Sequence, residues 1–312
     1  MTVFSELRYP TTRSAKLFTA ILALVLFLFL GMAIISGVLL FQVVRPSRSP
    51  SGLDVNALLG QASAVSFNVP GGAAREGWFF PGLRGAPTII LCHGYESQRS
   101  EVLTLVSALQ EAHYNIFVFD FAGHGTSPGI TSLGYREPGE VLAAIAVLAK
   151  RDDVDSSRFG LWGSDLGGYA ALAAAASEPR VAALVVDSIY ADPHDMLVIG
   201  MNHSGLQVLP LVARFAGLGF DILNHSDLHD PTLPALLPRL HGLPKLFIAS
   251  NDRPLLAAST ERLFQMAPEP RRQEIEKAGY NVMEDQADRR VYETLVVNFF
   301  LQNLPIAGRR SR

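Results

Sequence analysis

The chain has 312 residues, of which 49% are hydrophobic and 18% are charged, and its formal net charge at pH 7 is −3. This length allows one large domain or two small ones, and the near-neutral charge balance gives no reason to propose nucleic acid as a partner. A single cysteine, Cys92, excludes an internal disulfide and a thiolate metal cluster.

The first feature along the chain is an uncharged, strongly apolar run over residues 17–44. About 20 apolar residues are enough to span a bilayer as a helix, and buried core helices are rarely this long or this apolar. A cleaved signal peptide normally has an apolar region of roughly 7–15 residues that ends in small residues. We therefore expect a short N-terminal segment (residues 1–16) and then an uncleaved transmembrane anchor at 17–44, whose partner is the lipid bilayer.

Basic residues flank this run on both sides. Arg8, Arg13 and Lys16 precede it, and Arg45 and Arg48 follow it. Cytoplasmic flanks carry the excess of positive charge, so three cations against two favour a cytoplasmic N-terminus. The sequence thus predicts a single-pass membrane protein whose domain lies on the outer or periplasmic side.

A linker and a folded domain follow the apolar run. The stretch "RPSRSPSG" contains two prolines and three serines, which is typical of an extended connection, and the predicted linker covers residues 45–62. We expect the domain at residues 63–308, with a cap at about 190–243, and a basic tail at 309–312. The tail is most simply a solvated end, although lipid headgroups would also attract it.

Short apolar runs alternate with helical patterns throughout the predicted domain. Residues 63–69 and 77–80 are two early strands that favour a hairpin. Later continuous apolar runs are found at residues 87–92, 115–120, 158–162, 181–187 and 245–250. Such runs suit strands that are covered on both faces, and strand–helix alternation predicts an α/β fold with a mostly parallel, doubly wound sheet. Ligands bind such sheets at the carboxyl ends of the strands.

Loops at these strand ends carry recognisable motifs. They are His93-Gly94-Tyr95, "FAGHGTSPG" at residues 121–129, "GLWGSDLGGYAAL" at 160–172, "NDRPLL" at 251–256 and "AGYN" at 278–281. Their order resembles the α/β-hydrolase family, in particular its serine aminopeptidase-like and dienelactone hydrolase-like branches. The resemblance covers roughly residues 63–304. It implies an α/β-hydrolase fold with a cap insertion and a hydrolytic site.

The third motif resembles the nucleophile elbow, Gly-x-Ser-x-Gly, but departs from it. Asp165 stands between Gly163 and Gly167, whereas Ser164 has a tryptophan and a leucine at the same spacing. Small residues are needed two before and two after the strained central position, because backbone and helix crowd there. We therefore place Asp165, and not Ser164, in the nucleophile position.

The other two members of the family's triad are also affected. The family's Gly-His pair is replaced by a glycine and Tyr280, and no histidine follows His241. A tyrosine, with an ordinary pKa near 10, is protonated at neutral pH and is a poor base. Asp252 stands at or next to the acid position, with Arg253 as the rival alignment and Asp187 as a reserve candidate.

These replacements predict a catalytically degenerate site. We expect a hydrogen bond between Asp165 and Tyr280 in place of the serine–histidine pair, and the backbone N–H groups of Tyr95 and Leu166 as the oxyanion donors. A fixed carboxylate there would repel a developing oxyanion. The first hypothesis is a membrane-anchored protein without a cofactor, which binds a small ligand or a protein partner.

Two alternatives remain open. The chain could be an active hydrolase, either esterase- or peptidase-like or with an aspartate nucleophile as in dehalogenases and epoxide hydrolases, that takes its base from His203 or His225 of the cap. A metal site is conceivable where His225, Asp227, His229 and Asp230 are close in sequence. A polar loop before a proline explains that cluster more simply, so we expect no metal.

Overall fold

The structure, a computed structural model, describes residues 12–47, 62–71, 74–203 and 209–306. Residues 1–11, most of the predicted linker and the basic tail lie outside the described residues. The chain divides into two compact units. One comprises Met1–Val43 and Leu197–His225, and the other comprises Val44–Met196 and Ser226–Arg312.

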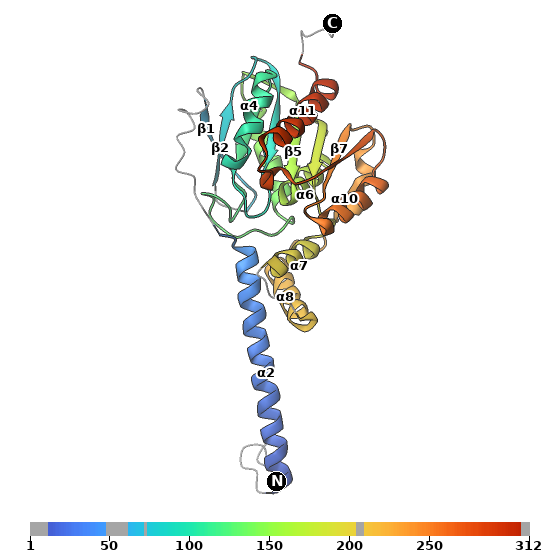
Figure 1. Ribbon diagram of the computed structural model, residues 1–312. Coiled ribbons are helices and arrows are strands. Elements are labelled where there is room, and N and C mark those ends of the chain that lie inside the picture. Colours follow the sequence, from blue (N-terminus) through green and yellow to red (C-terminus); the bar gives the residue numbers. More distant parts are fainter. Residues whose placement is uncertain (1–11, 48–61, 72–73, 204–208, 307–312) are drawn as a thin grey trace. The chain divides into compact units, whose positions relative to one another are not determined.

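The larger unit is built on an eight-stranded sheet with the order β1-β2-β4-β3-β5-β6-β7-β8 (Figure 1). The strands are β1 (Ser63–Asn68), β2 (Ala74–Phe80), β3 (Ala86–Cys92), β4 (Asn115–Phe119), β5 (Val154–Ser164), β6 (Val181–Asp187), β7 (Lys245–Ser250) and β8 (Arg271–Glu276). The β1–β2 and β2–β4 pairs are antiparallel, and all later pairs are parallel. The predicted α/β class with a mostly parallel sheet is therefore confirmed.

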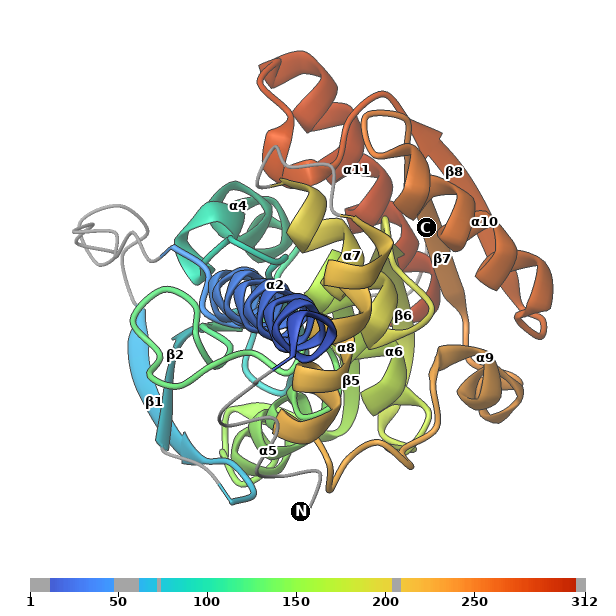
Figure 2. The same cartoon turned by 90° about the horizontal axis from the view of Figure 1, so that it is seen from below.

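Helices cover both faces of this sheet, as the fully buried strands β3 and β4 require. They are α4 (Leu103–Glu111), α5 (Glu137–Leu148), α6 (Asp165–Ala175), α9 (Leu233–Leu236), α10 (Pro254–Met266) and α11 (Gln286–Asn303), with short 3₁₀ turns η1 (Arg99–Val102), η2 (Leu237–Leu240) and η3 (Tyr280–Val282). The helices α4 and α11 share one face (Figure 2). Their apolar side chains pack there on alternate strand residues such as Ile89 and Trp162. The helices α5 and α6 pack against each other on the opposite face.

The smaller unit contains α2 (Arg13–Val44) up to Val43, α8 (Pro210–Leu223) and the part of α7 (Pro193–His203) from Leu197 onward. A helix thus covers the predicted span at 17–44 and begins four residues earlier. It is long and apolar enough to cross a membrane. The middle of the expected cap groups with α2 and not with the sheet, because α8 packs on α2: Ser36 Oγ donates a hydrogen bond of 3.1 Å to the carbonyl oxygen of Val212.

Candidate functional site

Strand β5 turns sharply into α6 at the predicted elbow. The strand ends at Ser164 in an extended conformation, and α6 begins at Asp165, whose φ of 36° lies in the left-handed region that non-glycine residues avoid. A Cβ on Gly163 would lie 2.3 Å from the carbonyl oxygen of Gly167, and a Cβ on Gly167 would lie 2.1 Å from that of Cys92. Only glycines fit on either side, so the turn places Asp165 at its tip.

The Asp165 carboxylate is almost completely buried, with 1% of the residue exposed. Its Oδ1 accepts hydrogen bonds from the backbone N–H of Tyr95, at 2.5 Å, and from that of Leu166. Its Oδ2 accepts one from Nη1 of Arg253, at 2.7 Å. The two N–H groups expected to form an oxyanion hole therefore converge on one point, and a carboxylate oxygen of the chain itself occupies that point.

Arg253 is the residue that sequence reasoning underrated, since it entered only as a rival alignment for the acid. Its side chain is 25% exposed, and its guanidinium forms an ion pair with a carboxylate that is only 1% exposed. A buried carboxylate requires a compensating charge. The loop "NDRPLL", which follows β7 at the same edge of the sheet, contains only one cation. The need of a buried carboxylate for a counter-charge could therefore have identified Arg253 from the sequence.

Tyr280 does not form the expected hydrogen bond with Asp165, and this prediction is wrong. The Tyr280 hydroxyl accepts from the backbone N–H of Leu105 at 2.9 Å, lies 2.6 Å from Thr104 Oγ1 and donates to Glu293 at 3.0 Å. It is therefore fully engaged with α4 and α11. Burial raises the pKa of Tyr280 above its ordinary value, which keeps the phenol protonated and leaves no phenolate to act as a base.

Packing explains this orientation. The Tyr280 ring lies edge-on to Trp162, with centroids 5.4 Å apart, and 5.1 Å from the ring of Tyr292. All three rings belong to the apolar cluster beneath α4 and α11. A phenol is longer than an imidazole, and here its hydroxyl reaches the first turn of α4, where backbone N–H groups lack partners within the helix.

Both candidate acids lie against the loop that carries Tyr280. Asp252 accepts a hydrogen bond of 3.0 Å from the backbone N–H of Gly279. Asp187 is fully buried at the end of β6, and burial raises its pKa. Its four donors are the hydroxyls of Ser188, Ser250 and Tyr292 and the backbone N–H of Tyr280. The geometry thus keeps both acids as candidates.

His93, which precedes Tyr95 by two residues, is a structural residue. His93 Nε2 accepts the backbone N–H of Phe121 at 3.1 Å, and Nδ1 lies 2.8 Å from the carbonyl oxygen of Gly94. Burial lowers the pKa of His93, so its imidazole is held neutral with both nitrogens engaged. The two cap histidines considered as bases belong to the smaller unit, and the side chain of His203 lies outside the described residues.

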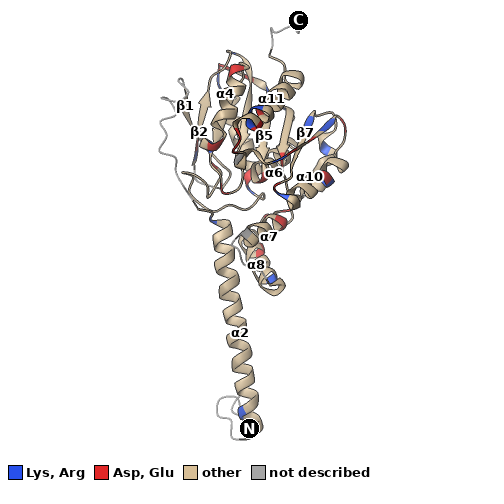
Figure 3. Cartoon of the chain, in the orientation of Figure 1, with Lys and Arg blue, Asp and Glu red and all other residues tan. Residues whose placement is uncertain are grey.

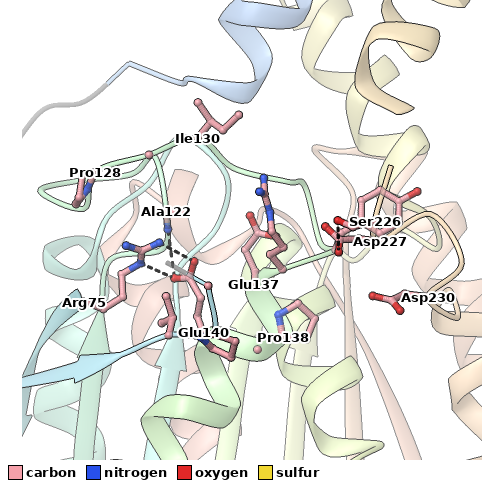
Figure 4. Close-up of a pocket in the computed structure, with 17 residues that line it drawn as sticks. Arg75, Ala122, Pro128, Ile130, Glu137, Pro138, Glu140, Ser226, Asp227 and Asp230 are labelled. Atoms are coloured by element: carbon pink, nitrogen blue, oxygen red, sulfur yellow. Dashed lines mark hydrogen bonds and ion pairs between the residues drawn. The ribbon is translucent and has the colours of Figure 1, made fainter. Parts of the chain in front are cut away.

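A separate polar hollow of about 730 Å³ lies beside the loop between β4 and α5 (Figure 4). One wall is the ion pair of Arg75 and Glu140, whose two hydrogen bonds measure 2.9 and 3.0 Å, and Asp227 and Asp230 stand at its other side. Asp165 and its partners do not line this hollow. Within the described ranges, no three histidine, cysteine or acidic side chains are grouped to hold a metal ion.

Sequence comparisons agree with the fold. A family model described as the α/β hydrolase fold matches residues 87–206. The uncharacterized protein YfhR of Escherichia coli O157:H7 is 30% identical over 254 residues, which cover 78% of this chain and 82% of that protein. The uncharacterized protein Rv2307c of Mycobacterium tuberculosis (strain ATCC 25618 / H37Rv) is 26% identical over 279 residues, covering 84% of this chain and 92% of that protein.

Solved structures show the same architecture. The esterase Pf2001 of Pyrococcus furiosus superposes with a TM-score of 0.67 at 18% identity, covering 84% of this chain and all of that chain. A dienelactone hydrolase from Anabaena variabilis ATCC 29413 superposes with a TM-score of 0.56 at 19% identity, covering 78% of this chain and 98% of that chain. At these identities the likeness is one of fold. The matching family model, supported by the sequence relative that is 30% identical, shows that the chain belongs to the α/β-hydrolase superfamily.

Proposed function

We propose that the protein is a membrane-anchored member of the superfamily that lacks serine-triad catalysis and acts by binding a ligand or a protein partner. One observation carries the proposal. The Asp165 carboxylate accepts hydrogen bonds from the backbone N–H groups of Tyr95 and Leu166, which would otherwise be free to stabilise an oxyanion. A substrate carbonyl would have to displace a hydrogen-bonded, ion-paired carboxylate before it received any stabilisation there.

The remaining requirements of acyl transfer are also unmet at this position. Triad chemistry needs a hydroxyl nucleophile and a base that accepts its proton. Asp165 offers no hydroxyl, and the Tyr280 hydroxyl is bonded elsewhere. Serine-triad hydrolysis at the elbow is therefore not supported.

An active hydrolase with Asp165 as nucleophile is the second candidate, because Asp165 occupies the strained tip of the turn. Against it, hydrogen bonds engage both carboxylate oxygens, and the Arg253 ion pair stabilises the ground state of the would-be nucleophile. Incubation with an alkyl halide, followed by intact-mass and peptide analysis, separates the two functions. An ester adduct on Asp165 would establish the enzyme, whereas the binding proposal expects an unmodified chain.

A rescue experiment tests the degenerate site directly. Asp165→Ser alone supplies a hydroxyl without a base, and Tyr280→His alone supplies a base without a hydroxyl. Triad members act as a unit, so we expect p-nitrophenyl acetate hydrolysis above background only in the double variant. Adding Ser164→Ala should leave the gain intact. Wild-type turnover that disappears in Asp165→Ala would refute the proposal.

The same variants identify the orienting acid. The gain in the double variant should disappear when Asp252→Asn is added, because the new histidine would lose the carboxylate that orients it. If the activity survives that change and is lost with Asp187→Asn, the buried carboxylate at the end of β6 is the acid instead.

The membrane anchor is the other part of the proposal. Its support is α2, which is 32 residues long and uncharged from residue 17 onward. Extraction of membranes with sodium carbonate should leave the full chain in the pellet, whereas full release would contradict the anchor. The cation count favours a cytoplasmic N-terminus. A reporter fused after Arg312 that works only in the cytoplasm would reverse this orientation.

A further inference from the structure

Helix α8 has one buried face and one exposed apolar face. Val212, Ala216 and Phe220 are buried at a spacing of four residues. On the other side, Leu211, Leu218 and Ile222 are 49%, 57% and 66% exposed. These exposed positions follow a spacing of seven and then four residues, so they form a stripe along one side of the helix. A stripe of large apolar side chains requires an apolar environment.

Contacts within the smaller unit fix where α8 lies along α2. The rings of Phe29 and Phe215 meet edge to face with centroids 5.0 Å apart, and Ser36 bonds to the backbone of α8. A Cβ on Gly219 would lie 2.8 Å from Leu40 Cδ2. The helix α8 is therefore packed along the second half of α2.

The part of α2 that contacts α8 falls inside the bilayer if α2 spans the membrane. A membrane core accommodates about 20 helical residues, and the uncharged run covers residues 17–44. The first stretch of that length is 17–36 and the last is 25–44, so every such stretch contains both Phe29 and Ser36. Figure 3 shows no charged residue along α2 between its first turns and its C-terminal end. Whatever the exact depth, the contacts of Phe29 and Ser36 with α8 lie within the hydrocarbon.

We propose that α8 is immersed in the hydrocarbon core of the membrane beside the second half of α2, with the stripe of Leu211, Leu218 and Ile222 against acyl chains. The inference rests on the proposed membrane anchor. The bilayer is the partner favoured here because the stripe continues the exposed apolar surface of α2, where side chains such as Phe27 are 72% exposed. A helix that lies in the interface and dips into the acyl region is a known way for amphipathic helices to bind lipid.

The charged residues of α8 are compatible with this placement. Arg214 is exposed on the same side as Leu211 and Leu218. A long arginine side chain can lie along apolar surface while its guanidinium reaches the phosphate level. Asp221 lies off the stripe and is half-buried. Neither charged residue belongs to the stripe of Leu211, Leu218 and Ile222 that is proposed to face the acyl chains.

The test uses single cysteines in the full-length protein reconstituted into phosphatidylcholine vesicles. The native Cys92 is fully buried, and burial raises its pKa, so it stays unlabelled while the protein is folded. The fluorophore NBD is attached to Leu218→Cys on α8, to Phe27→Cys on α2 and to Val291→Cys on α11. Val291 is a matched control, since it is an apolar side chain on a helix with 62% exposure.

Quenching by doxyl-labelled phospholipids gives distinct outcomes. We expect at least a twofold loss of NBD emission at positions 218 and 27 and little loss at position 291. The 5-doxyl lipid should quench position 218 more strongly than the 12-doxyl lipid, because Gly219 lies beside Leu40 near the end of α2. Quenching at 27 but not at 218 would overturn the inference and leave the anchor standing. Quenching at neither would remove the anchor as well.

A second protein copy covering the stripe is the main rival outcome. It would shift the NBD emission at position 218 to shorter wavelength without quenching by doxyl lipid, and that result would overturn the proposal. Ile222→Cys provides a second position on the stripe in case Leu218→Cys fails to fold, and circular dichroism checks the helix content of each variant. Agreement between the two positions supports immersion of the whole stripe.

Discussion

The ion pair of Asp165 and Arg253 predicts that Asp165→Asn lowers the free energy of unfolding in the wild type but raises it once Arg253 has been replaced. Replacing Arg253 with methionine leaves a carboxylate that is 1% exposed without its counter-charge. Breaking a buried pair from one side costs about 3–5 kcal/mol. Two backbone N–H groups still hold Oδ1, so we expect Arg253→Met to lower the free energy of unfolding by about 3 kcal/mol, near the lower end of that range.

The converse replacement should cost less. In Asp165→Asn the side-chain oxygen still accepts both N–H groups, and asparagine tolerates the left-handed φ of 36°. Arg253 is 25% exposed and can turn towards water. The loss should be about 1–2 kcal/mol, the strength of one or two weakened hydrogen bonds. In the Arg253→Met background the same change removes an unpaired charge, so it should raise stability by about 1–2 kcal/mol.

Urea denaturation in detergent micelles, followed by tryptophan fluorescence, measures this cycle. Trp162 is fully buried in the larger unit and reports on its unfolding. If Asp165→Asn destabilises both backgrounds equally, to within about 0.5 kcal/mol, the two sites are independent. Arg253 would then not be neutralising a buried carboxylate, and the proposed loss of serine-triad catalysis would lack its electrostatic support.

Three further predictions concern the scaffold. Gly167→Ala should abolish folding, because the new Cβ would lie 2.1 Å from a backbone oxygen, whereas Gly139→Ala, whose nearest neighbour is 4.0 Å away, should express and fold normally by circular dichroism. Burial lowers the pKa of Lys245 to about 8, against 10.5 when unfolded, so the unfolded state binds more protons between these two values. The stability of the wild type relative to Lys245→Met should therefore rise between about pH 8 and 10.5, and a difference between their melting temperatures that does not change with pH would contradict this. Glu137→Gln should cost about 2–3 kcal/mol in urea denaturation, because the fully buried carboxylate accepts four hydrogen bonds, whereas the exposed Glu284→Gln should be nearly neutral.

Most of the fold was predictable because its signals are local. Continuous apolar runs marked the buried strands, and the glycines around Asp165 marked the sharp turn, since each reflects a steric requirement of its own segment. The arrangement around Tyr280 was not predictable in the same way. The direction of its ring depends on partners distant in the chain, Thr104 and Glu293, whose positions only the folded packing defines.

Arg253 illustrates the same limit. The family resemblance assigns partners by position in the motif, and it therefore predicted that Asp165 pairs with Tyr280. Electrostatics selects a partner by charge and reach, and a buried carboxylate is stabilised more by a guanidinium than by a phenol. The grouping of α8 with α2 was likewise hidden, because the sequence of an amphipathic helix shows that it has an apolar face but not what covers it.

The glycines of the elbow have a consequence for how such a protein changes over evolutionary time. A Cβ on Gly168 would lie 2.4 Å from Ile189 Cγ2, so this glycine, like its neighbours, is required for the packing of the sheet. Selection for folding alone would then preserve the turn in a lineage that had lost its serine. Backbone packing therefore maintains this turn, whichever side chain stands at its tip. Only side chains, and no backbone, would have to change to place a different nucleophile at residue 165.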